Sequence, residues 1–155
     1  MIERLEIKSG TQKTISPEEM IHTIERLTGD NYDIFIGSDS QRIKDYVSFV
    51  TCLCLYKEGS GGIFFYLKER VDKKKYPNNK LRLLDEVYRS LELASDINTP
   101  SDKIKIHLDL NKENSSAFSF KFSKEFEGIV KACGYECALK PDGWATFLAD
   151  RFTKS

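Results

Sequence analysis

The order of strand-like and helix-like segments predicts an α/β fold, with one five-stranded mixed sheet that carries helices on both faces. Two observations support this prediction. Early in the chain, three apolar runs joined by short polar segments are typical of an antiparallel meander. The later part alternates helical and strand periodicity, which favours parallel strands connected by helices. The expected order is helix, three strands, helix, strand, helix, strand, helix.

Composition limits the class of protein. A chain of 155 residues suits one domain, so we expect residues 1–155 to form it, with 1–30 as an N-terminal helical extension and 31–154 as the core. The 24 Lys and Arg residues balance 24 Asp and Glu residues, so any nucleic-acid site must be a local patch. No run approaches the roughly 20 apolar residues of a membrane span. The start lacks a signal-peptide core, and we expect a cytoplasmic protein without membrane contact.

The helices are predicted from caps and apolar stripes. Residues 16–19, Ser-Pro-Glu-Glu, provide a capping hydroxyl, a proline at the first helical position and acids in the first turn. The apolar stripe that follows runs to Leu27, and Gly29 ends the helix. Apolar residues at helical spacing predict three further helices over residues 80–97, 118–133 and 144–152.

The strands are predicted over residues 32–39, 46–56, 63–67, 103–110 and 135–139. The glycine-rich turn at 57–62 joins the second and third strands into a hairpin. The four cysteines are Cys52, Cys54, Cys133 and Cys137. Their spacing does not match a zinc site, so we expect reduced thiols in the core.

Two acids occupy the same position relative to their strands. Asp39 follows Gly37 at the end of one apolar run, and Asp109 comes late in the run over residues 104–111. A carboxylate beside a packed core is costly unless it is hydrogen-bonded, paired or bound to a metal. Each acid is therefore either a hydrogen-bonded structural residue or part of a metal or proton-transfer site. Two strands that end in Asp predict a shared acidic site.

The element order is that of the ribonuclease H fold, and Leu-Ala-Asp-Arg at residues 148–151 resembles the run that carries the last acidic ligand in many ribonucleases H. The motifs at residues 37–41, 107–111 and 140–151 make this chain similar to the YkuK-like family of bacterial ribonuclease H-like proteins. The resemblance covers roughly residues 30 to 154. It implies a metal-dependent nuclease or related phosphodiester-cleaving enzyme, with Mg²⁺ or Mn²⁺ as cofactor and RNA or DNA as partner.

The resemblance also implies a set of ligands for two metal ions. Asp39 would contact both ions, Asp109 would hold one of them, and Asp150 would hold the other. Such a pair of ions activates a water and stabilises the leaving oxygen of a phosphodiester. The family usually provides a fourth carboxylate from the helix after the third strand. Asp85 and Glu86 are the candidates, and we favour Glu86 although both lie off the centre of the apolar stripe.

Further polar residues surround these acids. Asp142, in the loop before the last helix, is a candidate metal ligand or helix cap. His107 is either a hydrogen-bonded structural residue or a phosphate contact or proton carrier. Residues that could orient ligands or contact substrate, or simply form turns and strand ends, are Ser40, Gln41, Asn111 and Lys140.

A basic segment could hold a nucleic-acid backbone, with an aromatic ring stacked on a base, although charge runs in loops are often only solvated. It consists of Lys73, Lys74, Lys75 and Tyr76. Two other functions remain open at this point. One is a nucleic-acid-binding module that keeps the fold without cleavage. The other is a partner-binding domain in which the acids cap strands and helices.

Overall fold

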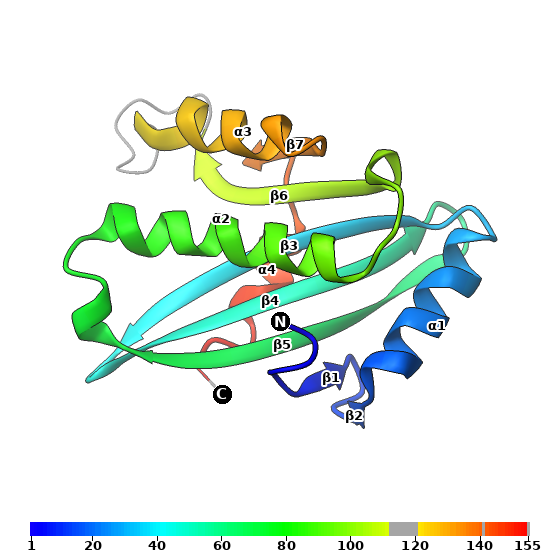
Figure 1. The fold of residues 1–155 in the computed structure, drawn as a ribbon, viewed down its shortest axis with the longest axis horizontal. Coiled ribbons are helices and arrows are strands. Elements are labelled where there is room, and N and C mark those ends of the chain that lie inside the picture. The colour runs from blue at the N-terminus through cyan, green and yellow to red at the C-terminus, as the bar shows by residue number, and fades with distance from the viewer. Residues whose placement is uncertain (112–120, 141, 155) are drawn as a thin grey trace.

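The computed structural model describes residues 1–111, 121–140 and 142–154, which form a seven-stranded mixed sheet with the strand order β2-β1-β5-β4-β3-β6-β7 (Figure 1). The strands are β1 (Ile7–Ser9), β2 (Thr14–Ile15), β3 (Asp33–Ile43), β4 (Tyr46–Lys57), β5 (Gly61–Asp72), β6 (Ile104–Asn111) and β7 (Glu136–Lys140). The helices are α1 (Pro17–Thr28), α2 (Asn79–Asp96), α3 (Ser123–Ala132) and α4 (Ala145–Asp150), with 3₁₀ turns η1 (Lys73–Lys75) and η2 (Ser101–Lys103).

The predicted α/β fold with a mixed sheet is confirmed, but the predicted number of five strands is wrong. Two short strands, β1 and β2, extend the sheet at the edge of β5. They lie within residues 1–30, which the sequence predicted to be an N-terminal helical extension. Strands of three and two residues are too short to give an alternating pattern, so the sequence could not predict them. The assignment of residues 1–155 to one domain stays a prediction.

The central strands are longer than predicted, and this changes the setting of the first acid. β3, β4 and β5 form the predicted antiparallel meander, while β6 pairs in parallel with β3 and β7. β3 does not end at Asp39 but continues to Ile43, because its last residues still pair with β4. The pairing of β3 with β6, in contrast, has its last residues at Gly37 and His107. Asp39 and Asp109 each lie two residues beyond this point, where the two parallel strands stop pairing.

The helices lie as predicted on both faces of the sheet, with α1, α2 and α3 on one face and α4 on the other (Figure 1). The predicted cap of α1 is present: the Ser16 hydroxyl accepts a hydrogen bond of 3.1 Å from the Glu19 amide. α3 is described from Ser123, and the first residues of the helix predicted over 118–133 lie outside the described residues. No helix in the described ranges is long and apolar enough to cross a membrane.

Alternation along β3 separates the two faces of the sheet. Ile34 and Ile36 are fully buried in the core beneath α1, α2 and α3. Phe35 belongs to the second core, beneath α4. Since successive side chains of a strand point to opposite faces, Asp39 shares the α4 face with Phe35, and Ser40 shares the α2 face with Ile36. Helices from both sides can therefore bring polar groups to the same part of β3.

The cysteines divide into two pairs. Cys52 and Cys54 are buried on β4 beneath α4, and burial raises the pKa of the Cys54 thiol to about 12. This pair fits the prediction of free thiols in the core. Cys133 is exposed and Cys137 is half-buried, so the prediction of core burial does not hold for Cys133. It follows the last turn of α3, where the chain leaves the helix for β7.

Candidate active site

Asp39 and Asp150 meet on the α4 face because α4 lies directly against β3. A Cβ atom added to Gly37 would be only 2.8 Å from the Thr146 nitrogen and 2.9 Å from the Ala145 carbonyl carbon. Only a glycine allows the helix backbone to approach the strand so closely. The helix then carries Asp150 to Asp39, and their carboxyl groups share a hydrogen bond.

His107 fixes the other end of α4. Its Nδ1 accepts hydrogen bonds of 3.0 Å from the backbone amides of Trp144 and of Ala145. The side chain is buried, and burial, together with the charge of Lys105, lowers the pKa of the imidazole to about 4. His107 is therefore neutral near physiological pH, with Nδ1 as an acceptor. Of the two predicted roles, the structure supports the structural one, as a helix cap that positions α4.

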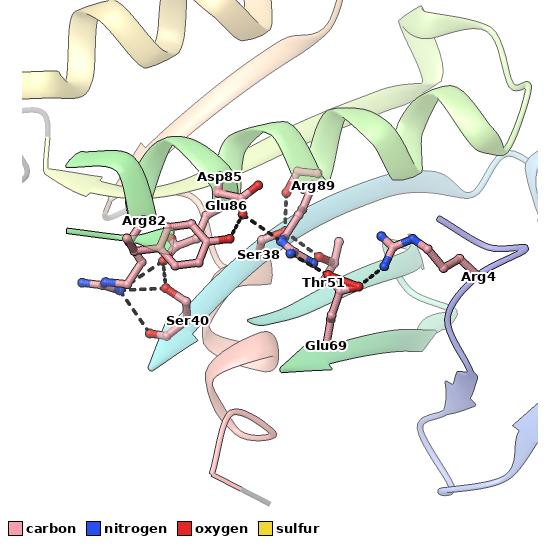
Figure 2. Close-up of polar contacts among 11 residues, drawn as sticks. Arg4, Ser38, Ser40, Thr51, Glu69, Arg82, Asp85, Glu86 and Arg89 are labelled. Atoms are coloured by element: carbon pink, nitrogen blue, oxygen red, sulfur yellow. Dashed lines mark hydrogen bonds and ion pairs between the residues drawn. The ribbon is translucent and has the colours of Figure 1, made fainter. Parts of the chain in front are cut away.

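Glu86 approaches from the opposite face of the sheet, on α2. Its side chain is buried, its Oε2 accepts a hydrogen bond from the Ser40 hydroxyl, and Arg82 Nη1 lies 3.5 Å from the same oxygen (Figure 2). Asp85 instead binds Arg89 and the Tyr76 hydroxyl. Of Asp85 and Glu86, the two candidates for the helix carboxylate, Glu86 is therefore the one that interacts with Asp39 and Asp109.

The apolar face that the sequence predicted for α2 is rotated from the face that the structure buries. The sequence predicted an inward stripe formed by Leu84, Val87 and Leu91, with both Asp85 and Glu86 off its centre. In the structure the buried residues include Leu83, Glu86, Val87 and Ser90, so the inward face is rotated and contains a carboxylate. Leu84 is only partly buried. The buried Ser38 and Ser40 on β3 provide the polar surface that accommodates Glu86 and Ser90.

Electrostatic interactions join the four carboxylates into one centre. The pKa of Asp39 is raised to about 8 by burial first, then by the charge of Asp109 and by the hydrogen bond to Asp150, although the Ser40 amide favours the ionised form. Burial, followed by the charge of Asp39, raises the pKa of Glu86 well above its usual range, and Asp109 contributes in the same direction. Carboxylates this close to one another cannot all stay ionised without added positive charge.

Side chains of the protein itself partly supply that charge. Lys140, at the end of β7, forms an ion pair with Asp109, and Arg82 lies beside Glu86. Among residues 1–111, 121–140 and 142–154, no three His, Cys, Asp or Glu side chains are grouped in an arrangement that could hold a metal ion. Asp39 and Asp150 contact each other, whereas Asp109 contacts Lys140 and Glu86 contacts Ser40 and Arg82. A divalent ion would therefore require at least the ion pair of Lys140 with Asp109 to open.

The donor set nevertheless fits Mg²⁺ or Mn²⁺ in its chemistry. It consists of hard carboxylate oxygens, which these ions prefer. The raised pKa values of Asp39 and Glu86 indicate that positive charge is lacking at this centre. A cavity of about 10 Å³, lined by residues that include Glu86 and Asp109, lies between α2 and the sheet at this position. This is close to the space that one water molecule needs.

The residues predicted to flank the acids lie around the same centre. Ser40 contacts Glu86 and also accepts a hydrogen bond of 2.7 Å from Arg82. Gln41 is half-buried on the face of Asp39, and Asn111 is half-buried in register with Lys140. The structure thus brings all four predicted flanking residues to this end of β3, β6 and β7.

Asp142 is exposed in the turn before α4, and its predicted role as a cap of this helix stays a prediction. The amides of Trp144 and Ala145, at the start of the helix, donate to His107. A histidine from a neighbouring strand cannot be identified as a cap from local sequence, because caps are normally supplied by the residue that precedes the helix. The role of Asp142 as a metal ligand stays a prediction.

The structure corrects the role predicted for Tyr76 as a base-stacking residue. Its ring is 8% exposed and packs 5.1 Å from the ring of Phe49, and its hydroxyl donates to Asp85. The ring is therefore not available to a base. Residues 73–75 form the exposed 3₁₀ turn η1 after β5, so their lysines stay available as predicted backbone contacts.

Sequence reasoning missed a polar network that attaches α2 to the sheet (Figure 2). Arg89 Nη2 lies 2.8 Å from Glu69 Oε1 on β5, and Glu69 also pairs with Arg4. The guanidinium of Arg89 lies 4.2 Å from the ring centroid of Phe49. The signal in the sequence was the presence of charged residues at inward positions of β5 and α2. This network holds α2, and therefore Glu86, in place.

Comparisons with known proteins agree with this architecture. Residues 17–154 match a protein-family model described as ribonuclease H-like. The chain is also 27% identical over 141 residues, covering 80% of each chain, to the uncharacterized protein YkuK of Bacillus subtilis (strain 168). The resemblance drawn from the sequence motifs is thereby confirmed. β1 and β2 precede the matched range.

Proposed function

Because the chain belongs to the ribonuclease H-like family, we propose that it is a divalent-metal-dependent nuclease or a related phosphodiester-cleaving enzyme. One observation carries the proposal: four carboxylates from β3, β6, α2 and α4 interact at one end of the sheet, where the pKa of Asp39 is raised to about 8. Groups with such strongly shifted pKa values are concentrated at functional sites. Mg²⁺ or Mn²⁺ would provide the positive charge that this centre lacks.

The residues that would hold the ions are Asp39, Glu86, Asp109 and Asp150. A divalent cation bound there would polarise a phosphodiester and lower the pKa of an attacking water. Ser40 holds the buried Glu86 through its hydroxyl, and Arg82 lies beside the same carboxylate. These contacts restrict the rotamers of Glu86 and so keep its oxygens near β3. They are the supports that a catalytic carboxylate needs in order to stay oriented.

Two side chains would act on the substrate or on the geometry of the site. Lys140, when released from Asp109, would be free to bind a phosphate oxygen as a charge-assisted donor. His107 would not transfer a proton, because its Nδ1 is already occupied by the amides at the start of α4. Its role would be to keep α4 in place. The substrate is proposed to be RNA or DNA, in keeping with the family.

Titration calorimetry with Mn²⁺ tests the metal site. We expect the wild type to bind, and both Asp39→Asn and Glu86→Gln to lower the affinity at least about tenfold, which corresponds to about 1.4 kcal/mol. Asp85→Asn is the matched control, because Asp85 is adjacent in sequence but faces Tyr76 and Arg89. Binding that is unaffected by Asp39→Asn and Glu86→Gln would overturn the proposed site.

Cleavage assays then address the activity itself. Labelled RNA, DNA, RNA–DNA hybrid and branched DNA should be incubated with Mg²⁺ or Mn²⁺ and the wild type or Asp39→Asn. We expect at least one substrate to be cut by the wild type and not by the variant, which also controls for contaminating nucleases. Cleavage that persists in Asp39→Asn would show that this centre is not responsible.

The ion pair of Lys140 with Asp109 favours a second candidate function, a ribonuclease H-like module that binds nucleic acid without cleaving it. In such a module an ammonium group would permanently replace the metal ion. The module would bind oligonucleotides in fluorescence anisotropy, and the wild type would show no Asp39-dependent binding of Mn²⁺. Detectable Asp39-dependent binding in the wild type would exclude this alternative.

A further inference from the structure

A second cavity lies away from the acidic centre, between the added strand β1 and β5. It has a volume of about 480 Å³ and is lined by Glu6, Lys8, Tyr66, Lys68 and Arg70. Lys8 pairs with Tyr66 across the two strands, and Tyr66 belongs to the core beneath α4. Since alternate residues of β5 share a face, Lys68 and Arg70 lie on the same face as Tyr66. The cavity therefore opens on the α4 face of the sheet.

The lining of this cavity is positively charged although the chain has a formal net charge of zero. Three cationic side chains accompany one carboxylate, Glu6. The carboxylate is engaged locally, because it accepts a hydrogen bond of 2.6 Å from Thr14 and lies 3.6 Å from Lys8 Nζ. Burial, together with the charge of Arg70, lowers the pKa of Lys68. Cations that disfavour one another in this way form a site that gains from a bound anion.

The cavity and the acidic centre occupy the same cross-strand row. Asp39 pairs with Val50 on β4, and Val50 pairs with Lys68 on β5. Two residues further along β3 and β5, Gln41 is aligned across β4 with Arg70 in the same way. With neighbouring strands about 4.8 Å apart, the backbone of Lys68 lies roughly 10 Å from that of Asp39. A polymer with regularly spaced negative charges can span this distance, whereas a single small anion cannot reach both positions.

We propose that the cavity between β1 and β5 is a phosphate subsite, in which Lys8, Lys68 and Arg70 hold the backbone of a nucleic acid whose neighbouring segment reaches the acidic centre. The assignment of a nucleic acid as the ligand rests on the proposed function. β1 precedes the range matched by the ribonuclease H-like family model, so the subsite is built partly from an element outside that range. The added strand thereby extends the binding surface along the α4 face.

Fluorescence anisotropy with labelled single-stranded and duplex oligonucleotides tests the subsite. The measurement is made in EDTA, so that binding does not depend on a metal ion. We expect Lys68→Met with Arg70→Met to lower the affinity for single strands at least about tenfold, and to reduce the salt slope by about 1.4, since each phosphate contact contributes about 0.7. Lys8→Met alone should reduce the slope by about half as much. Arg26→Met with Lys124→Met is the matched control, because both residues are exposed on helices of the other face.

The outcomes separate this inference from the proposed nuclease function. A variant lacking Lys68 and Arg70 that binds as tightly as the control variant, with the same salt slope, overturns the subsite. Retained binding in the charge-preserving variant Lys68→Arg with Arg70→Lys supports the subsite, because that variant keeps both positive charges. Asp39→Asn is expected to bind normally in EDTA. If it binds normally but the wild type never cleaves, the nuclease function fails while the subsite stands.

Discussion

Asp39 should make the affinity of the protein for Mn²⁺ strongly dependent on pH. Burial, the charge of Asp109 and the hydrogen bond to Asp150 raise the pKa of Asp39 to about 8. Below that pH the carboxyl group carries a proton, which a metal ion must displace before it binds. The ionised fraction is about one half at a pH equal to the pKa and about one hundredth two pH units below it, so the affinity should fall about 50-fold between about pH 8 and about pH 6. Glu86, whose pKa is raised as well, can only steepen this dependence.

Titration calorimetry over this pH range checks the prediction directly. Repeating each titration in two buffers with different ionisation enthalpies measures the protons released, and at about pH 6 we expect about one proton or more for each bound ion. Asp39→Asn should release fewer protons and show a weaker pH dependence. A wild-type affinity that stays constant over this range, or an equally steep dependence in Asp39→Asn, would refute the inference that Asp39 is a protonated metal ligand.

Four further perturbations test the geometry of the site. Asp39 binds its proton more tightly in the folded protein than in the unfolded chain, where its pKa is about 3.8, so its contribution to stability is lost as the pH rises toward about 8. Asp39→Asn should therefore raise the unfolding free energy of the metal-free protein at about pH 8. A decrease in this free energy, measured by urea denaturation, would instead indicate a structural acid. Gly37→Ala should push α4 away from β3, lower the unfolding free energy by about 1–3 kcal/mol and weaken Mn²⁺ binding. An unchanged melting temperature and an unchanged affinity for Mn²⁺ would contradict the close packing of α4 on β3. Lys140→Met should strengthen Mn²⁺ binding in calorimetry, because the ammonium no longer competes for Asp109, and weaker metal binding would argue against that competition. His107→Ala leaves one buried and one partly buried amide without their acceptor and should lower the unfolding free energy by about 1–3 kcal/mol, whereas a pH-rate profile of any activity should keep its shape.

The parts of the fold that the sequence predicts well are those in which local preference and burial agree. Ser16 and Pro17 begin α1 as predicted, because a capping hydroxyl and a proline at the first position act within one turn. The central strands were also predicted, since both of their faces are covered and they consist of continuous apolar runs. The added strands β1 and β2 were missed because their stability comes from pairing with β5 and not from their own few residues.

The site follows the same division between local and long-range information. Asp39 and Asp109 could be paired from the sequence alone, because parallel strands place equivalent residues side by side. The environment of Glu86 could not be predicted, since the rotation of α2 depends on a polar network with β5 whose partners, such as Glu69 and Arg89, are far apart in the sequence. Tyr76 shows the reverse error: its basic neighbours predicted an exposed aromatic, whereas its ring fills a gap against Phe49.

The carboxylates of the centre are not held equally firmly, and this difference has a consequence for how metal binding would proceed. Asp39 lies on a strand that is hydrogen-bonded to β4 along its length, and Glu86 is buried beneath an 18-residue helix. Asp150, in contrast, ends a helix of six residues, which is too short to be stable by its own hydrogen bonds. Its position depends on Gly37, on the cap provided by His107 and on the packing of the helix against the sheet. The shared hydrogen bond between Asp39 and Asp150 must open when both carboxylates ionise, and α4 is the element best able to adjust.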